Sequence, residues 1–141
     1  MPTSTASAVW EGGLKGGKGE FKGNSGLVGG GYTFATRFES AKGTNPEELI
    51  ASAHAACYSM ALSAGLEAKG KTPTRVSTTA EVILSMDGGP HISKIKLTTR
   101  GTVPGLDQAG FAAAAEEAKK GCPISKLFAN NAVIELDAKL E

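Results

Sequence analysis

The sequence contains two cysteines, Cys57 and Cys122, and their thiols are its most distinctive reactive groups. Two cysteines are too few for the disulfide framework of a small secreted domain. In a reducing compartment, free thiols are either small buried apolar residues or groups that are oxidised and reduced in turn. Composition leaves both interpretations open, so the surroundings of each cysteine must decide between them.

Cys57 lies inside the run "GTNPEELIASAHAACYSMALSAG", which predicts a long helix. Asn45 and Pro46 are typical of an N-cap and a first helical residue, and Glu47 in the first turn interacts favourably with the helix dipole. Cys57 is too far from that end for the dipole to ionise it, and apolar burial raises the pKa of a thiol. A reactive thiolate at this position therefore needs a cation from elsewhere in the protein.

Arg37 is the natural source of that cation, because a guanidinium stays charged even when it is buried. In "YTFATRFE", the aromatic residues alternate onto one face of an expected strand, and Arg37 falls on the other face. Glu47 is expected to hold this arginine through a charge-assisted hydrogen bond.

Cys122 lies in "GCP", between a glycine that ends one helix and a proline that begins the next helical turn. This position predicts a half-exposed junction that can move toward a partner sulfur.

Other candidate sites find less support. His54 lies three residues before Cys57 on a neighbouring helical face, and a core or interface histidine and a role beside the thiol both remain open. Neither histidine has a Cys or His at metal-ligand spacing, so no metal site is predicted. "GGLKGGKG" resembles a phosphate loop, but Gly19 replaces the Ser or Thr, which favours a turn. No G-x-S-x-G occurs, so the usual signature of a serine hydrolase is missing.

The elements that position these groups follow from periodicity and capping. We expect short glycine-rich strands over 8–38, a long helix over 46–70 and a hairpin around "DGGP" over 75–86 and 91–102. A second helix from a cap at Asp107 to Gly121, a helical turn over 122–131 and a last strand over 132–141 follow. Strands and helices in separate blocks predict an α+β fold with antiparallel sheets, a long buried central helix and a second, shorter helix. The length predicts a single domain over residues 1–141.

Charge and hydropathy exclude several classes of partner. Fifteen Lys and Arg residues against 14 Asp and Glu leave a net charge of +1, and no basic stripe indicates nucleic-acid binding. Residues 49–66 carry no charged side chain, which reaches the lower limit for a membrane span, but their serines and alanines favour a helix inside a soluble fold. The N-terminus shows no secretion signal, so we expect a cytoplasmic protein.

Taken together, these stretches resemble the OsmC branch of the OsmC/Ohr family, the osmotically inducible and organic-hydroperoxide-resistance proteins. The similarity covers nearly the whole chain and is specific at "WEGGLKGGKG", "FATRFE", "KGTNPEELIASAHAACYSMALS" and "AKKGCPISK". The resemblance implies a thiol peroxidase with an OsmC-like fold, built as an intertwined homodimer without metal, haem or other cofactor.

The resemblance also implies a role for each candidate residue. Cys57 matches the peroxidatic cysteine, Cys122 the resolving cysteine, Arg37 the arginine that stabilises the thiolate, and Glu47 the carboxylate that positions the arginine. Cys57 would then reduce an organic hydroperoxide to its alcohol and form an intrachain disulfide with Cys122, which a dithiol donor such as a lipoylated protein resets. A non-catalytic redox sensor or stress-binding protein using the same cysteine pair, and an inert fold with two buried cysteines, are the alternatives.

Two further expectations concern the surroundings of the thiol. Met60, Phe111 and Phe128 either form an apolar lining that favours organic substrates or belong to the core. Glu47 and Cys57 are separated by about 15 Å along one helix, so one arginine cannot contact both within a single chain. Two copies of the helix that cross antiparallel near Ser52 would bring Glu47 of one chain opposite Cys57 of the other.

Overall fold

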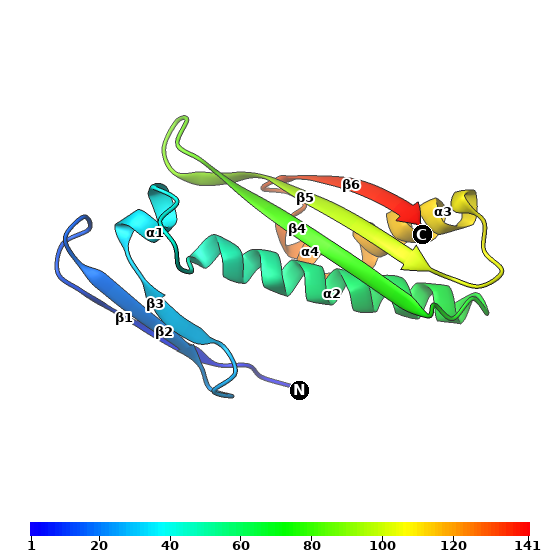
Figure 1. The fold of residues 1–141 in the computed structure, drawn as a ribbon, viewed down its shortest axis with the longest axis horizontal. Coiled ribbons are helices and arrows are strands. Elements are labelled where there is room, and N and C mark those ends of the chain that lie inside the picture. The colour runs from blue at the N-terminus through cyan, green and yellow to red at the C-terminus, as the bar shows by residue number, and fades with distance from the viewer. The chain divides into compact units, whose positions relative to one another are not determined.

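The computed structural model describes all residues, from Met1 to Glu141 (Figure 1). Two compact units emerge from the contacts within the chain: an N-terminal unit, residues 1–48, and a C-terminal unit, residues 49–141. Each unit is described below by itself.

The N-terminal unit contains a three-stranded antiparallel sheet. Its strands are β1 (Ala6–Glu11), β2 (Lys18–Gly23) and β3 (Gly29–Tyr32), in the order β1-β2-β3. Gly19 on β2 lies between Trp10 and Tyr32, where a Cβ atom would approach both rings to 2.6 Å. The absence of a side chain at Gly19 therefore allows the two rings to meet, with their centroids 5.3 Å apart.

A short helix, α1 (Phe34–Phe38), follows β3 and corrects one expectation from the sequence. The alternating aromatic residues around Arg37 predicted a strand, and that prediction is wrong. Thr33 and Thr36 form a capping box in which each side chain accepts a hydrogen bond from the other residue's backbone N–H. Phe34 and Phe38 then stack one turn apart, with ring centroids 4.8 Å apart, as i and i+4 residues of a helix do.

The long helix α2 (Pro46–Ala68) begins and ends as the sequence predicts. The Asn45 side chain accepts a hydrogen bond of 2.8 Å from the backbone N–H of Glu48, so Asn45 is the N-cap. At the other end, Gly70 has a φ of +73°, and the backbone N–H of Lys71 donates to the carbonyl of Leu66. This is a Schellman motif, in which glycine accepts the left-handed conformation that ends the helix.

Only one stripe of α2 is buried in the single chain, whereas the sequence predicted a long buried central helix. The buried residues of this stripe recur every fourth position and are His54, Tyr58, Leu62 and Leu66. The exposed residues on the opposite face are small or flexible and are Ser52, Ala53, Ala56, Met60 and Ala64. By length and composition α2 could cross a membrane, but a core helix meets the same criterion. Its buried stripe packs in the protein core.

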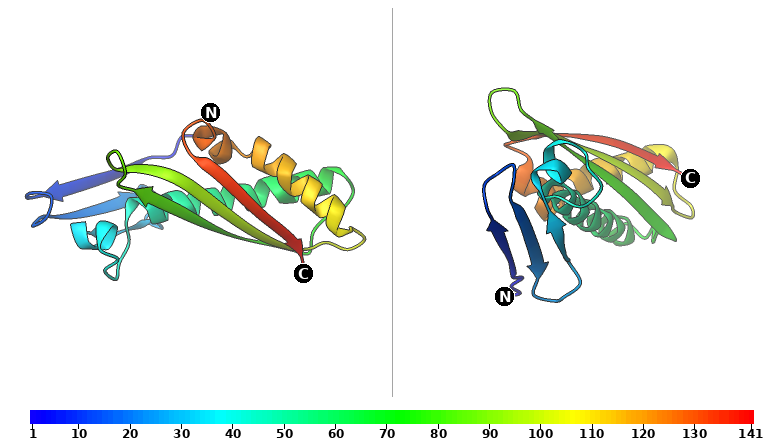
Figure 2. Two further views of the ribbon diagram at one scale, coloured as in Figure 1. Left: turned by 90° about the horizontal axis from the view of Figure 1, so that it is seen from above. Right: turned by 60° about the vertical axis from the view of Figure 1, so that its left-hand side comes forward.

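The C-terminal unit is built on a second three-stranded sheet (Figure 2). Its strands are β4 (Arg75–Ser85), β5 (His91–Thr102) and β6 (Val133–Leu140), in the order β4-β5-β6. β4 and β5 form the predicted antiparallel hairpin, with an irregular register at Ile83 and Leu84. β6 pairs parallel to β5, from Lys94 opposite Val133 to Gly101 opposite Leu140, which corrects the prediction of purely antiparallel sheets. The two helices between β5 and β6 carry the chain back to the edge of the sheet where β5 begins, so that β6 can run in the same direction as β5.

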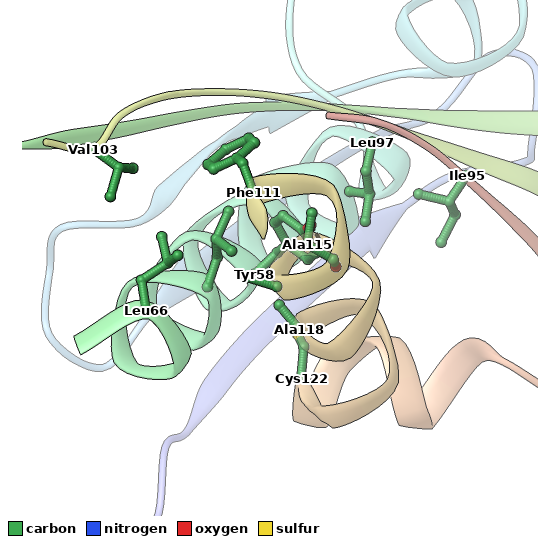
Figure 3. Close-up of a cluster of buried hydrophobic side chains, with 11 residues drawn as sticks. Tyr58, Leu66, Ile95, Leu97, Val103, Phe111, Ala115, Ala118 and Cys122 are labelled. Carbon is green, nitrogen blue, oxygen red and sulfur yellow. Dashed lines mark hydrogen bonds between the residues drawn. The ribbon is translucent and has the colours of Figure 1, made fainter. Parts of the chain in front are cut away.

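Those helices are α3 (Gln108–Gly121) and α4 (Pro123–Phe128). α3 is the predicted second helix, and its N-cap Asp107 accepts a hydrogen bond from the backbone N–H of Gly110. The core lies between β5 and the helices α2 and α3 (Figure 3). At its centre the Phe111 ring lies against Gly101 of β5, where a Cβ atom would come within 2.4 Å of the ring.

Candidate functional site

The two cysteines meet inside the C-terminal unit. Cys57 lies in the middle of α2, and Cys122 lies at the junction of α3 and α4. Both are free thiols, and the Sγ atom of Cys122 donates a hydrogen bond of 3.2 Å to the Sγ atom of Cys57. The sequence separates these residues by 65 positions, so the tertiary fold alone creates the pair.

The exposure of the two thiols is the reverse of what the sequence predicted. Cys122 was expected at a half-exposed junction, yet it is fully buried beside Ala118 (Figure 3). Its backbone ends α3 by donating to the carbonyl of Ala118, and its own carbonyl accepts from Lys126 in α4. The junction of α3 and α4 therefore directs the Cys122 thiol inward, toward Cys57 of α2. Cys57 is only half-buried, because it borders the exposed face of α2.

The surroundings of Cys57 within its own unit do not activate it. Burial raises the pKa of the Cys57 thiol, and the neighbouring Cys122 raises that pKa further. A backbone hydrogen bond from Ile124 in the first turn of α4 opposes this effect. No cationic side chain is among the groups that shift this pKa.

Arg37 and Glu47 form an ion pair inside the N-terminal unit. The Nη2 and Nε atoms of Arg37 donate to Oε1 of Glu47 at 2.8 and 3.1 Å, and Nε also lies 3.3 Å from Oε2. Arg37 projects from α1 rather than from the expected strand, and Glu47 lies in the first turn of α2. The Glu47 carboxylate is almost buried, so its negative charge is held beside the guanidinium with little access to water.

An aromatic pocket of about 230 Å³ opens beside the Arg37 guanidinium. The Arg37 guanidinium carbon also lies 5.3 Å from the centre of the Phe38 ring. The pocket thus combines one cation with apolar walls. The lining residues are Trp10, Leu14, Tyr32, Thr33, Phe34, Arg37 and Phe38. Sequence analysis assigned none of these aromatic residues to a site, although their alternation around Arg37 was visible.

His54 forms a second buried pair with a residue that sequence analysis did not identify. The Nε2 atom of His54 lies 2.7 Å from Oγ of Ser125, and both residues are essentially unexposed. Burial lowers the pKa of His54, so its ring is neutral at neutral pH. Its other ring nitrogen, Nδ1, is buried without a hydrogen-bond partner. The signal in the sequence was the matched spacing of these residues: His54 precedes Cys57 by three positions, and Ser125 follows Cys122 by three.

The three residues considered as an apolar lining have different environments. Phe111 is a core residue under β5, and Met60 is exposed on the outer face of α2. Phe128 is partly buried near His54, with the two ring centres 6.2 Å apart. None of the three contributes to the pocket beside Arg37.

Comparisons with known proteins place the chain in a family. A family model described as OsmC-like protein matches residues 39–137. The chain is 49% identical over 136 residues to the peroxiredoxin OsmC of Escherichia coli strain K12, an alignment that covers 95% of this chain and 94% of that protein. It is 34% identical over 95 residues to the organic hydroperoxide resistance protein of Xanthomonas axonopodis pv. citri strain 306, covering 67% and 66%.

Among solved structures, an organic hydroperoxide resistance protein from Elizabethkingia anophelis shares the fold with a TM-score of 0.79. The similarity covers 99% of both chains at 22% sequence identity.

Proposed function

This chain belongs to the OsmC-like protein family and is a thiol peroxidase, and on that basis we propose that it reduces organic hydroperoxides to alcohols, with Cys57 as the peroxidatic and Cys122 as the resolving cysteine. The observation that carries this proposal is the 3.2 Å contact between the two free thiols. Their exposure supports the assignment of roles. The half-buried Cys57 is open to a substrate, whereas the buried Cys122 is shielded from it.

The proposed reaction has two steps in the protein. The Cys57 thiolate attacks the terminal oxygen of the hydroperoxide, the O–O bond breaks, and Cys57 becomes a sulfenic acid. The other oxygen leaves as an alkoxide and takes up a proton from solvent to give the alcohol. The Cys122 thiol then attacks the Cys57 sulfur and displaces water, which leaves a disulfide. Because the sulfur atoms already lie 3.2 Å apart, they need to approach by only about 1 Å to reach disulfide bonding distance.

A dithiol donor completes the cycle by thiol–disulfide exchange and is itself oxidised to a disulfide. A lipoylated protein or another small dithiol fits this role, because it can leave as a cyclic disulfide after it has reduced Cys57 and Cys122. We place this activity in the cytoplasm, where reductants of this kind keep thiols reduced.

Activation of Cys57 is assigned to Arg37 of a second copy of the chain. Burial and the neighbouring Cys122 raise the pKa of Cys57, so the thiolate requires a nearby positive charge. The guanidinium of Arg37 binds Glu47, and Glu47 is ten positions, or about 15 Å along α2, from Cys57 of the same chain. An antiparallel crossing of two α2 helices over their exposed small residues would supply the missing arginine and create two equivalent sites in a homodimer.

The organic group of the substrate is assigned to the aromatic pocket beside Arg37. A pocket of about 230 Å³ with apolar walls favours an alkyl or aryl hydroperoxide over hydrogen peroxide, which has no apolar part to bury. The same guanidinium that stabilises the thiolate would then lie next to the bound peroxide.

A turnover assay separates this enzyme from a redox sensor built on the same cysteine pair. With cumene hydroperoxide and an excess of dihydrolipoamide, the wild-type protein should consume many equivalents of peroxide per chain, and Cys57→Ser should consume none above the uncatalysed rate. Peroxide consumption that stops after one equivalent per chain would contradict the proposal and favour a sensor.

A further inference from the structure

The contact between His54 and Ser125 runs alongside the contact between the two cysteines. His54 is one turn before Cys57 on α2, and Ser125 is three residues after Cys122 in α4. The polar atoms of the outer pair lie 2.7 Å apart, and the sulfur atoms of the inner pair lie 3.2 Å apart. Two adjacent contacts therefore join the middle of α2 to one short segment, residues 122–125.

Backbone hydrogen bonds and core packing hold that segment at its ends, and the two side-chain contacts orient it against α2. α4 is only six residues long, and its N-cap, Cys122, makes no side-chain capping bond. The backbone hydrogen bond from Ile124 to Cys57 lies between the two side-chain contacts and also depends on the position of the segment. When Cys57 is oxidised, its thiol can no longer accept the hydrogen bond from Cys122 in the same way. The contact between His54 and Ser125 does not involve the reacting sulfur atoms, so oxidation of Cys57 removes neither of its polar atoms.

The unpaired nitrogen of His54 argues that this residue does more than fill space. Nδ1 is buried without a hydrogen-bond partner, which destabilises the fold relative to an apolar side chain of similar volume. Packing of His54 near Phe128 would be available to such an apolar residue as well. What an apolar residue cannot provide is the hydrogen bond to Ser125.

We propose that the His54–Ser125 hydrogen bond is a positioning contact that keeps Cys122 within reach of oxidised Cys57 and thereby favours the disulfide over irreversible oxidation. This inference rests on the proposed function. The sulfenic acid of Cys57 has two competing fates. Attack by Cys122 gives a disulfide and water, whereas a second hydroperoxide transfers one oxygen to the sulfenic acid, which becomes a sulfinic acid while the peroxide becomes an alcohol.

The test is a competition between these two fates. Reduced protein is mixed with increasing concentrations of cumene hydroperoxide and quenched with a thiol-blocking reagent, and peptide mass spectrometry then gives the ratio of Cys57–Cys122 disulfide to Cys57 sulfinic acid. Both products form from the same sulfenic acid, so any effect on the first oxidation of Cys57 cancels in this ratio. Ser125→Ala removes one buried oxygen and should lower the ratio about five- to tenfold at each peroxide concentration, the effect expected from one lost hydrogen bond.

Three further variants make the result specific. Ser125→Thr restores the hydroxyl and should recover most of the ratio. His54→Leu keeps a buried side chain of similar size but removes the hydrogen bond, so it should lower the ratio as Ser125→Ala does. It replaces Ser125→Ala in the test if Ser125→Ala does not fold. Ser59→Ala is the matched control, because it removes a 2.8 Å hydrogen bond from α2 to Thr78 of β4 and leaves α4 untouched.

The outcomes separate this inference from the proposed function. A wild-type ratio in both Ser125→Ala and His54→Leu, or an equal fall in Ser59→Ala, would overturn the positioning role while leaving the peroxidase intact. Wild-type protein whose two thiols survive the peroxide would overturn the proposed function, and the inference with it.

Discussion

Arg37 donates hydrogen bonds from two neighbouring guanidinium nitrogens to one oxygen of Glu47, at 2.8 Å from Nη2 and 3.1 Å from Nε. This side-on contact fixes the plane of the guanidinium and leaves its remaining N–H groups available to another acceptor. The ion pair is therefore suited to present a positive charge in one orientation.

Replacing this arginine should suppress the ionisation of Cys57. In Arg37→Ala the effect of burial is unopposed by a cation, so the pKa of Cys57 should rise and its oxidation by cumene hydroperoxide should slow by at least about tenfold at neutral pH. Arg37→Lys should recover little, because an ammonium cannot make the same forked contact. Glu47→Gln should shift the pKa in the same direction but less. The check is a thiol titration of each variant in a Cys122→Ser background, and an unchanged pKa in Arg37→Ala would contradict this account.

Complementation between chains should reveal whether the site is shared. As pure proteins, Cys57→Ser is expected to be inactive and Arg37→Ala to be at least about tenfold slower than the wild type. After the two are unfolded, mixed and refolded together, a mixed dimer with shared sites holds one intact site, so peroxidase activity should rise above that of Arg37→Ala alone. Mixing Cys57→Ser with Cys57→Ala is the control and should remain inactive. If the activity of the first mixture does not rise although mixed dimers form, Arg37 and Cys57 must act within one chain.

The buried His54 should make stability depend on pH below neutrality. Burial lowers its pKa in the folded protein, so the unfolded chain binds a proton first as the pH falls through about 6.5. The stabilisation that comes from keeping His54 neutral is therefore complete above about pH 6.5. As the pH falls toward the lowered pKa of the folded protein, the free energy of unfolding decreases by no more than about 1.4 kcal/mol per pH unit. Urea unfolding at about pH 7.5 and about pH 5.5 should show a smaller loss for His54→Leu than for the wild type. Equal losses in the two proteins would rule out His54 as the source.

Gly101 should be intolerant of a side chain because of the ring that covers it. An added Cβ would clash with the ring of Phe111, which is fully buried in the core. Gly101→Ala should therefore lower the free energy of unfolding by about 1–3 kcal/mol in denaturant titrations. Combining Gly101→Ala with Phe111→Leu should cost less than the sum of the two changes. Gly121→Ala, where a Cβ meets nothing within 4 Å, is the control and should be nearly neutral.

Local signals in the sequence predicted the elements of this fold well where capping and turns decide them. Asn45 and Asp107 cap their helices as expected, and Gly70 ends α2. The strand predicted around Arg37 was wrong. The prediction followed the alternation of the aromatic residues, whereas in the structure the capping box of Thr33 starts a helix there. The parallel pairing of β6 also escaped prediction, since strand direction depends on the path of the two helices before it and not on the pattern of the strand.

The candidate site was predictable only in part for a similar reason. The residue types and helix position of Cys57 indicated a thiol that needs an external cation, and the pairing of Arg37 with Glu47 is present. The burial of Cys122 depends on how the turn between α3 and α4 faces α2, which no local pattern encodes. Ser125 was missed because its one signal, a three-residue spacing from Cys122 that matches the spacing of His54 from Cys57, gains meaning only when the contact across the fold is known.

Titration with a single equivalent of hydroperoxide tests most directly whether Cys57 and Cys122 act as the reactive pair. Reduced wild-type protein treated with one equivalent of cumene hydroperoxide per chain should lose both thiols and the mass of two hydrogen atoms, and its peptides should contain the Cys57–Cys122 disulfide. The Cys122→Ser variant should instead hold a sulfenic acid that a dimedone-type reagent captures on Cys57. Thiols that remain after the treatment, or a captured adduct on Cys122 in Cys57→Ser at the wild-type rate, would contradict the assignment.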